Sequence, residues 1–158
     1  IYSAFECMLK IYDKIDMKVM LAGTLKLPWQ DSNRCIIVLN GKELLDYIRD
    51  AEITIFKQHG LEESGAGNYH YLSPSELYGY LSDFANSFED KDIPIMCCTC
   101  DEIGCASVRI NIIKKQNSVI WENFRSVRDE WDLGYAFEFD KQEYSDFLRK
   151  IRNTSDNG

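Results

Sequence analysis

The sequence predicts a single α+β domain with a mostly antiparallel sheet and about three helices. Segments with the pattern of strands gather in the first forty residues and in the last third of the chain, and helical periodicity appears between and after them. The chain has 158 residues, 45% of them hydrophobic, which is enough for one packed core. We expect residues 1–152 to form this domain and residues 153–158 to be a frayed polar tail.

The first forty residues are predicted to be strands. Residues 1–12 (IYSAFECMLKIY) and 17–27 (MKVMLAGTLKL) are rich in apolar side chains and partly alternating, with a polar stretch between them. A third strand is expected at 35–41 (CIIVLNG). It closes on Asn40 and Gly41, a pair that tolerates the positive φ angles of a tight turn.

A helix is predicted directly after this turn. Leu44, Leu45 and Ile48 recur at helical spacing, so we expect the helix to run from about Lys42 to Asp50. Residues 59–72 contain several glycines and are expected to form a loop.

A second helix is predicted to begin at SPSEL. Ser73 is a good N-cap, Pro74 suits the first helical position, and Glu76 completes a capping box. We expect this helix to end near Phe88, because the charged EDKD and Pro94 cannot continue it.

The last third of the chain is predicted to be a second group of strands followed by a helix. Residues 93–100 and 105–113 flank the DEIG turn as a hairpin, and further strands are expected at 118–124 and 135–140. Asp140 is then expected to cap a final helix at 141–151.

The charge balance favours a basic protein partner. Lys and Arg total 18 against 26 Asp and Glu, a net charge of −8. Such a chain repels phosphate backbones, so no nucleic-acid partner is expected. No apolar run is long enough to cross a bilayer and no basic-then-apolar leader opens the chain, so no membrane partner is expected. The alternative is that the acidic residues only keep the protein soluble. The oligomeric state stays open.

Four of the six cysteines lie within nine residues, in CCTCDEIGC. Cys97, Cys100 and Cys105 could supply three zinc ligands, but no fourth Cys or His stands at a recognisable zinc spacing. We therefore favour buried or turn cysteines and expect no metal and no cofactor. A zinc-stabilised domain and a redox pair of Cys97 with Cys100 are the alternatives. Cysteines used as small buried apolar residues suit a reducing compartment, so a cytoplasmic location is expected.

Catalytic chemistry has little support in the sequence. His59 and His70 are the two histidines, and both lie in or beside the glycine-containing loop, where exposed histidines are common. The GxSxG, P-loop and HExxH motifs do not occur in the sequence. A non-enzymatic protein is therefore predicted, and an enzyme that uses one of these histidines is the alternative.

Two acidic segments supply candidate partner-binding residues. In RDEWDLG, Trp131 is flanked by acidic side chains, and an aromatic anchor ringed by charge is typical of binding hot spots. The alternative is a loop tryptophan that folds back onto the core. The second segment is the pair of glutamates in the glycine-containing loop. The candidates are Asp129, Glu130, Trp131, Asp132, Glu62 and Glu63.

The order of motifs from residue 36 to residue 148 resembles a group of small uncharacterised bacterial proteins. That group shows NGxxL, GxY, CxCGExGC, VxWxxF and FxFDxxxY motifs, which here read LNGKELLDYI, GNYHYLSPSEL, CTCDEIGC, VIWENF and FEFDKQEY. Asp101 stands where the group's pattern has Gly. By size, acidity and α+β character the chain is also similar to immunity proteins of bacterial toxin systems, such as those of contact-dependent inhibition. This similarity implies a protein that binds and blocks a toxin domain, for example a nuclease.

Overall fold

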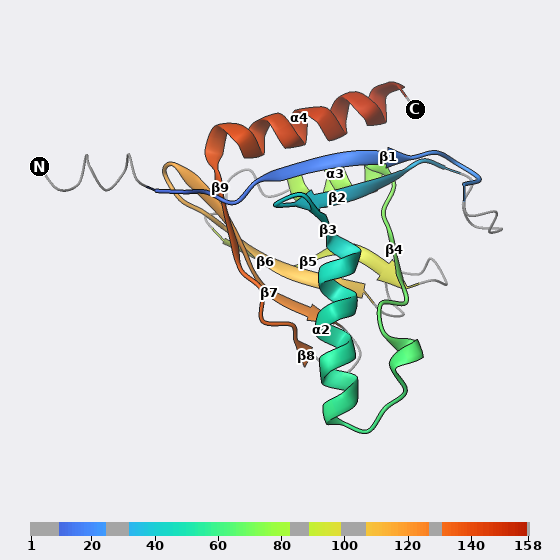
Figure 1. Cartoon of the computed structure of the whole chain (residues 1–158). Helices are drawn as coiled ribbons and strands as arrows, with labels where there is room; N and C mark the ends of the chain where they lie inside the picture. The colour runs from blue at the N-terminus through green and yellow to red at the C-terminus, as the bar shows by residue number, and fades with distance from the viewer. Residues whose placement is uncertain (1–9, 25–31, 83–88, 99–106, 127–130, 158) are drawn as a thin grey trace, which may run out of the picture.

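Two antiparallel sheets and three α-helices make up the described part of the chain (Figure 1). The structure, a computed structural model, describes residues 10–24, 32–82, 89–98, 107–126 and 131–157. The predicted α+β class is confirmed. Predictions for residues 1–9, 25–31, 83–88, 99–106, 127–130 and 158 lie outside the described residues.

The first sheet has three strands in the order β1-β2-β3. These are β1 (Ile15–Met20), β2 (Arg34–Leu39) and β3 (Lys42–Glu43). The predicted turn is confirmed, because Asn40 has a φ of 51° and Gly41 a φ of 79°. Strand β1 begins two residues earlier than expected and ends before the turn at 22–24. Residues 10–12, which were predicted to be strand, do not belong to one.

The second sheet has the order β4-β5-β6-β7-β8, and β9 pairs with the first half of β7. Its strands are β4 (Tyr69–Tyr71), β5 (Glu89–Cys98), β6 (Ser107–Lys114), β7 (Ser118–Ser126), β8 (Trp131–Asp132) and β9 (Phe137–Asp140). The predicted pairing of the two segments around DEIG is confirmed by the antiparallel register of β5 with β6.

Two features of this sheet differ from the prediction. Strand β5 begins at Glu89, four residues before the expected start. Its pairing with β6 shifts register between Asp90 and Ile93, and Asp92 adopts a φ of 59° at this irregular step. Pro94 fits inside the strand beside a second register shift, where a missing N–H is tolerated. Strand β4 lies within the segment expected to be a loop, and its pairing to β5 gives those residues backbone partners.

Helix α2 (Leu44–Gln58) is longer than predicted. Its buried side chains recur every four residues, at Leu44, Ile48, Glu52 and Phe56, so the apolar stripe continues past Asp50 with one carboxylate in it. That carboxylate is satisfied by hydrogen bonds, which is why it does not end the helix.

The remaining helices are α3 (Pro74–Ser82) and α4 (Lys141–Asn157). Both predicted N-caps are confirmed. Ser73 Oγ accepts a hydrogen bond from the Glu76 amide at 3.3 Å, and Asp140 Oδ2 accepts from the amide of Glu143 at 3.1 Å. The prediction of a frayed tail from residue 153 is wrong, because α4 continues to Asn157. The Thr154 hydroxyl bonds the Lys150 carbonyl one turn back, at 2.9 Å, and so helps to satisfy this last part of the helix.

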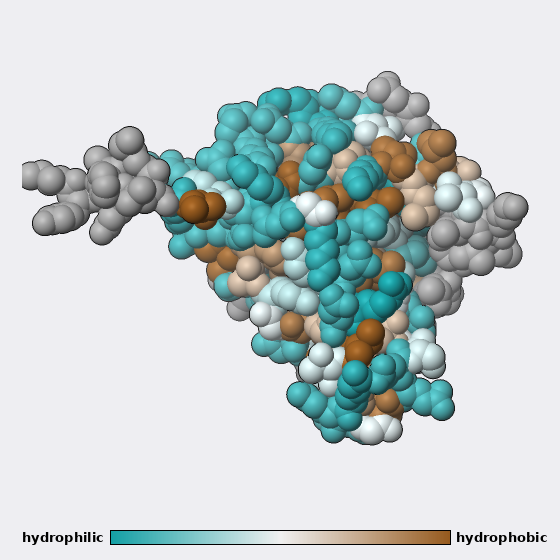
Figure 2. All heavy atoms as spheres, in the orientation of Figure 1, coloured by the Kyte–Doolittle hydropathy of each residue, from teal (hydrophilic) through white to brown (hydrophobic). Residues whose placement is uncertain are grey.

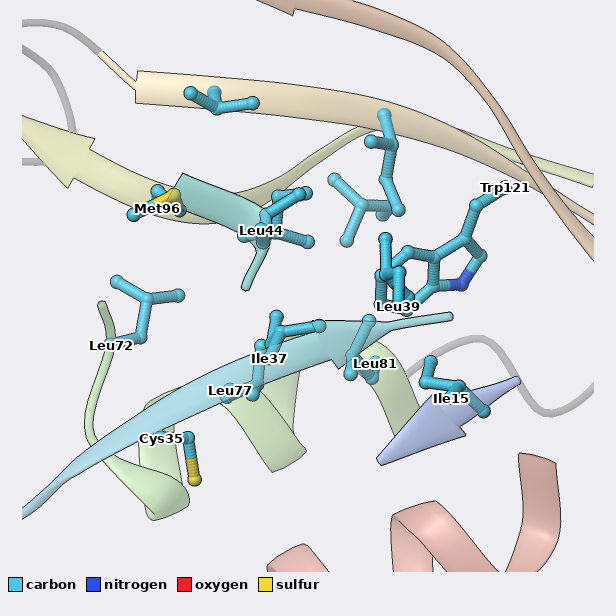
Figure 3. Packing of buried hydrophobic residues seen from close by; sticks show 14 of the residues in the cluster. Ile15, Cys35, Ile37, Leu39, Leu44, Leu72, Leu77, Leu81, Met96 and Trp121 are labelled. Carbon is cyan, nitrogen blue, oxygen red and sulfur yellow. The ribbon is translucent and has the colours of Figure 1, made fainter. Parts of the chain in front are cut away.

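The core lies between the two sheets and is closed by the helices (Figure 1). Leu39 from β2 and Trp121 from β7 point toward one another in Figure 3, and both are fully buried. Trp121 Nε1 donates a hydrogen bond to the hydroxyl of Tyr144 on α4 at 3.2 Å, so the indole keeps a partner inside the core. In contrast, the face of the molecule in Figure 2 is mostly hydrophilic, with scattered apolar patches.

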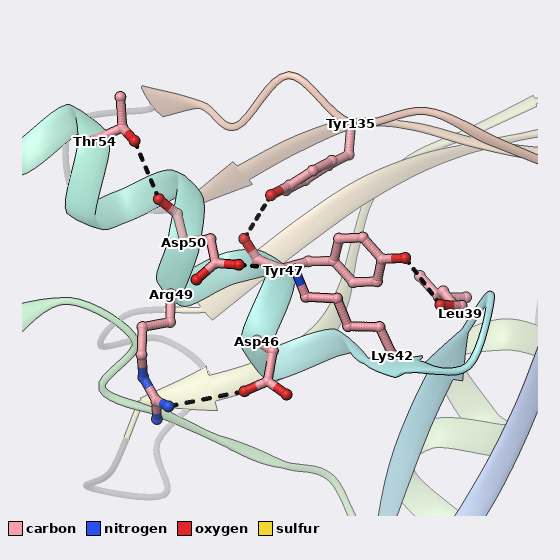
Figure 4. A network of polar contacts seen from close by, with 8 residues as sticks. All are labelled: Leu39, Lys42, Asp46, Tyr47, Arg49, Asp50, Thr54 and Tyr135. Carbon is pink, nitrogen blue, oxygen red and sulfur yellow. Dashed lines mark hydrogen bonds and ion pairs between the residues drawn. The ribbon is translucent and has the colours of Figure 1, made fainter.

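The first half of α2 is fixed to β2 and to the segment that joins β8 to β9 by the contacts shown in Figure 4. The Tyr47 hydroxyl donates to the Leu39 carbonyl at 2.9 Å, and the Tyr135 hydroxyl donates to the Tyr47 carbonyl at 2.8 Å. Lys42 binds Asp50 at 2.7 Å and lies 4.6 Å from the Tyr47 ring centroid. Because the start of the helix is held in this way, its C-terminal end projects to one end of the molecule (Figure 1).

Candidate functional site

Trp131 packs against the C-terminal end of α2. Its indole stacks on the ring of His59, with centroids 5.5 Å apart and planes 11° apart, and it meets the ring of Phe56 edge-on at 5.4 Å. Phe56 is buried, whereas His59 is exposed and Trp131 is half-buried. Trp131 therefore folds back onto the helix, and part of its surface faces solvent. Whether it anchors a partner stays a prediction.

The end of α2 presents His59 because of the way the helix stops. Gly60 has a φ of 68°, and its amide bonds the Lys57 carbonyl at 3.2 Å. The Leu61 amide bonds the Phe56 carbonyl at 2.8 Å. These two bonds form a Schellman C-cap, in which glycine supplies the left-handed residue. The cap turns the chain sharply, so Leu61 emerges 48% exposed.

Glu62 and Glu63 follow this cap and are both exposed. Glu63 begins a short 3₁₀ helix, η1 (Glu63–Gly65). Its Oε1 lies 3.6 Å from Lys57 Nζ in a surface ion pair. Gly65 at the end of η1 packs on Phe56, since a Cβ there would lie 3.0 Å from the ring. The acidic loop and Trp131 thus contact the same phenylalanine, although they are far apart in sequence.

Asp132 faces the opposite side of the sheet from Trp131. Side chains alternate along a strand, and Trp131 is paired with Ser126 while Asp132 is paired with Arg125. Asp132 is exposed, and its Oδ1 accepts a hydrogen bond from the Gly134 amide at 2.8 Å. Strand β8 is an edge strand, so the two side chains reach the two faces of one sheet edge. Asp129 and Glu130 lie outside the described residues.

Glu52 holds the acidic loop against α2, and the sequence analysis missed this residue. Its side chain is 1% exposed, and its carboxylate accepts hydrogen bonds from the Gly67 amide at 2.9 Å and from the Tyr69 hydroxyl at 2.8 Å. A buried carboxylate is stable only with such partners. The signal that could have revealed it is a glutamate at the four-residue spacing of the apolar stripe.

His70 is buried, contrary to the exposure expected for the histidines. It lies on β4 opposite Cys97 of β5, and these residues are 6% and 1% exposed. Cys97 Sγ lies 3.4 Å from His70 Nε2 and 3.5 Å from Nδ1, and Nδ1 is 3.0 Å from the Tyr71 carbonyl. The pair is closed off from solvent, so a substrate cannot reach it in this structure. The other histidine, His59, is exposed and stacks on Trp131.

The described cysteines differ in state. Cys35 and Cys97 are buried in the core and form no disulfide, as expected for structural cysteines, whereas Cys98 is disulfide-bonded. A disulfide is uncommon in a reducing compartment, so the expected cytoplasmic location stays a prediction. Within the described ranges, no three His, Cys, Asp or Glu side chains are grouped to hold a metal ion. Cys100 and Cys105, the other candidate zinc ligands, fall outside those ranges.

Comparisons with known proteins found no relative of this chain. No protein-family model, no curated protein and no solved structure matches the chain. Among the described residues, no helix is both long and apolar enough to span a membrane.

Proposed function

We propose that this protein is an acidic, non-enzymatic binding protein that contacts a basic protein partner with the C-terminal end of α2. The observation that supports this most directly is the half-buried Trp131 stacked on exposed His59, next to the loop that carries Leu61, Glu62 and Glu63. An aromatic anchor with a charged surround is the usual composition of a binding hot spot.

The charge of the molecule supports a basic partner. The net charge of −8 would speed the encounter with a positively charged surface. Glu62 has no ion pair with another described residue, and Glu63 has a solvent-exposed pair with Lys57 that contributes little stability. Both carboxylates are therefore available at low cost. Asp132, with Asp129 and Glu130 before it in the sequence, would extend the contact around the sheet edge.

The kind of partner that fits best is a toxin domain, so we propose an immunity-type inhibitor. A nuclease holds phosphate with Lys and Arg side chains, and the acidic end of α2 would occupy those side chains and occlude the site. A specific and stable interface would bury roughly 1,200–2,000 Å² in total. This size requires surface beyond the α2 end itself, and the β8 edge is the adjoining candidate. A cytoplasmic location and the absence of a cofactor belong to the same proposal.

The test compares two variants that change the charge equally. One carries Glu62→Gln, Glu63→Gln and Asp132→Asn. The control carries Glu122→Gln, Glu143→Gln and Asp146→Asn, which lie on β7 and α4. The partner is captured from the native cell at low salt, and association rates are measured across a salt series. We expect the first variant to associate roughly tenfold more slowly with a weaker salt dependence, and the control to stay near wild type.

Equal slowing by both variants would mean that only net charge matters and that the α2 end is not the contact. Trp131→Ala should raise the dissociation rate, and a melting measurement on the free variant separates this effect from loss of the packing on Phe56. Unchanged kinetics in the acidic variant and in Trp131→Ala would contradict the proposed interface.

A zinc-stabilised domain is the alternative, and one contact favours it. Cys97 and His70 are both zinc-ligand types and lie 3.4 Å apart. Elemental analysis of purified protein decides between the zinc-stabilised domain and the metal-free binding protein. Stoichiometric zinc, with melting that a chelator lowers, would support the alternative. Metal-free protein with unchanged melting would remove it.

A further inference from the structure

A polar cavity lies at the end of the molecule opposite the tip of α2. Its volume is about 280 Å³, and it is formed where the segment before β2, the N-terminus of α3 and the last turns of α4 meet. Figure 1 shows α3 and the C-terminal end of α4 beside β2, and the free end of α2 at the other extreme. The helical extension of α4 past residue 152 is what closes this cavity, because it brings Thr154 and Ser155 into the lining.

The lining is rich in hydroxyl groups. Ser32 and Asn33 come from the segment before β2, Ser75 from α3, and Thr154 and Ser155 from α4. Each hydroxyl can both donate and accept a hydrogen bond. The Pro74 ring adds apolar surface next to them. A ligand with several hydroxyl groups and an apolar ring face would be complementary to such a lining.

Several of these groups are available to a ligand. The side chains of Ser32 and Ser155 form no hydrogen bond to another described residue. Asn33 uses Oδ1 to accept from the Ala22 amide at 2.9 Å, which leaves both Nδ2 protons as donors. In contrast, Ser73 and Glu76 are engaged with each other, because the Ser73 hydroxyl donates a hydrogen bond to Glu76 Oε1 at 2.8 Å. The available groups therefore come from the segment before β2 and from α4, on either side of the α3 N-cap.

The charges around the cavity favour a neutral ligand. Glu76 is the one charged side chain among the described lining residues, and it disfavours an anion. A cation would meet the N-terminus of α3, where the helix dipole is positive, although the C-terminus of α4 contributes the opposite sign. The two opposed helix dipoles give no strong preference for an anion or a cation. The hydroxyl groups of a neutral ligand, in contrast, can form hydrogen bonds with every side of the lining.

We propose that this cavity binds a neutral polyhydroxylated ligand of about the size of one monosaccharide. The volume lies just below the usual range for small-molecule pockets, so its size suits a single sugar ring. This site is separate from the proposed partner contact at the α2 tip, and the two can fail independently.

The test is an NMR titration of the ¹⁵N-labelled full chain with glucose, galactose, mannose and N-acetylglucosamine as probes. We expect at least one sugar to shift the amide signals of Asn33, Ser75 and Ser155 in a saturable way. Ethylammonium and inorganic phosphate are titrated in parallel as a cationic and an anionic probe. Saturable shifts of these amides by either ion and by no sugar would overturn the proposed ligand class.

Two double variants locate the binding. Ser32→Ala with Ser155→Ala removes the two available hydroxyls and should weaken sugar binding roughly tenfold, since each lost hydrogen bond costs a severalfold change in affinity. The control is Ser64→Ala with Ser145→Ala, two exposed serines outside the cavity, and it should bind as the wild type does. Equal binding by all three proteins, or no saturable shift with any sugar, would overturn the proposal.

Discussion

Glu52 is the residue on which the shape of the acidic loop depends most. It is the buried carboxylate of α2, and its two hydrogen bonds reach Gly67 and Tyr69, which lie just before and within β4. Gly67 is itself constrained, because its φ is 71° and a Cβ would lie 2.9 Å from the Arg49 Cβ. The position whose backbone amide donates to the Glu52 carboxylate therefore requires glycine.

We predict that Glu52→Ala destabilises the protein by about 3 kcal/mol, because it leaves a buried amide and a buried hydroxyl without an acceptor. Glu52→Gln should cost about half as much, since its one carbonyl oxygen can still accept from one of the two donors. Urea denaturation measures both free energies. Glu62→Ala serves as an exposed control and should stay within about 0.5 kcal/mol of wild type. If Glu52→Ala were no worse than this control, the anchoring role would be wrong.

At the scale of elements, α4 is tied to the edge of the first sheet. Lys150 Nζ donates to Asp16 Oδ1 at 2.8 Å and to the Met17 carbonyl at 3.0 Å. Strand β1 is an edge strand, so the second bond also occupies a backbone carbonyl that would otherwise be open to pairing. The hydrogen bond from Lys150 lowers the pKa of the Asp16 carboxyl below its ordinary value of 3.8.

This tie predicts a pH effect with a definite sign. Because the pKa of Asp16 is lowered in the folded state, its contribution to stability is present above pH 3.8 and is lost as the pH falls through the folded-state pKa. Lys150→Met should raise the Asp16 pKa, because the largest cause of its lowering is removed, as measured by NMR titration of the carboxyl. The cost in stability near neutral pH should be about 0.5 kcal/mol, since the pair is exposed. Lys42→Met, in an unrelated ion pair, should leave that pKa unchanged.

At the scale of the whole molecule, the two sheets are joined through β2. The Cys35 amide donates to the Leu72 carbonyl at 2.8 Å, which links the first sheet to the segment after β4. The Cys35 side chain is fully buried at this junction, and burial raises the pKa of its thiol from the ordinary 9.0 to about 12. The folded protein therefore keeps this thiol protonated at a pH where the unfolded chain ionises it.

The consequence is a loss of stability in alkaline solution. Between pH 9 and pH 12 the unfolded chain releases the Cys35 proton and the native state does not, so the free energy of unfolding falls with pH in this window. We predict that Cys35→Ala is less stable than wild type at pH 7. Its free energy of unfolding should, however, fall less steeply with pH than that of wild type, by up to ~1.4 kcal/mol per pH unit. Urea denaturation at pH 7, 9 and 10.5 measures the two slopes. Parallel slopes would contradict the buried thiol.

Several predictions that rest on neighbouring residues were confirmed by the structure. The Asn40–Gly41 turn and the Ser73 and Asp140 caps follow from conformational preferences or hydrogen bonds within a few residues. Boundaries were less predictable, since α2 and α4 each run several residues past their expected ends. Those extensions are stabilised by packing and by side-chain partners that a local pattern does not contain.

The sequence by itself determined the α+β class, the caps and turns, and the acidic net charge, because each depends on composition or on local backbone energetics. Only the tertiary structure decided that Trp131 and the Glu63 loop meet on Phe56, that Glu52 is buried, and that His70 faces Cys97. These contacts join residues separated by long stretches of chain. Their formation depends on how the sheets and helices pack as a whole, and no single segment encodes that packing.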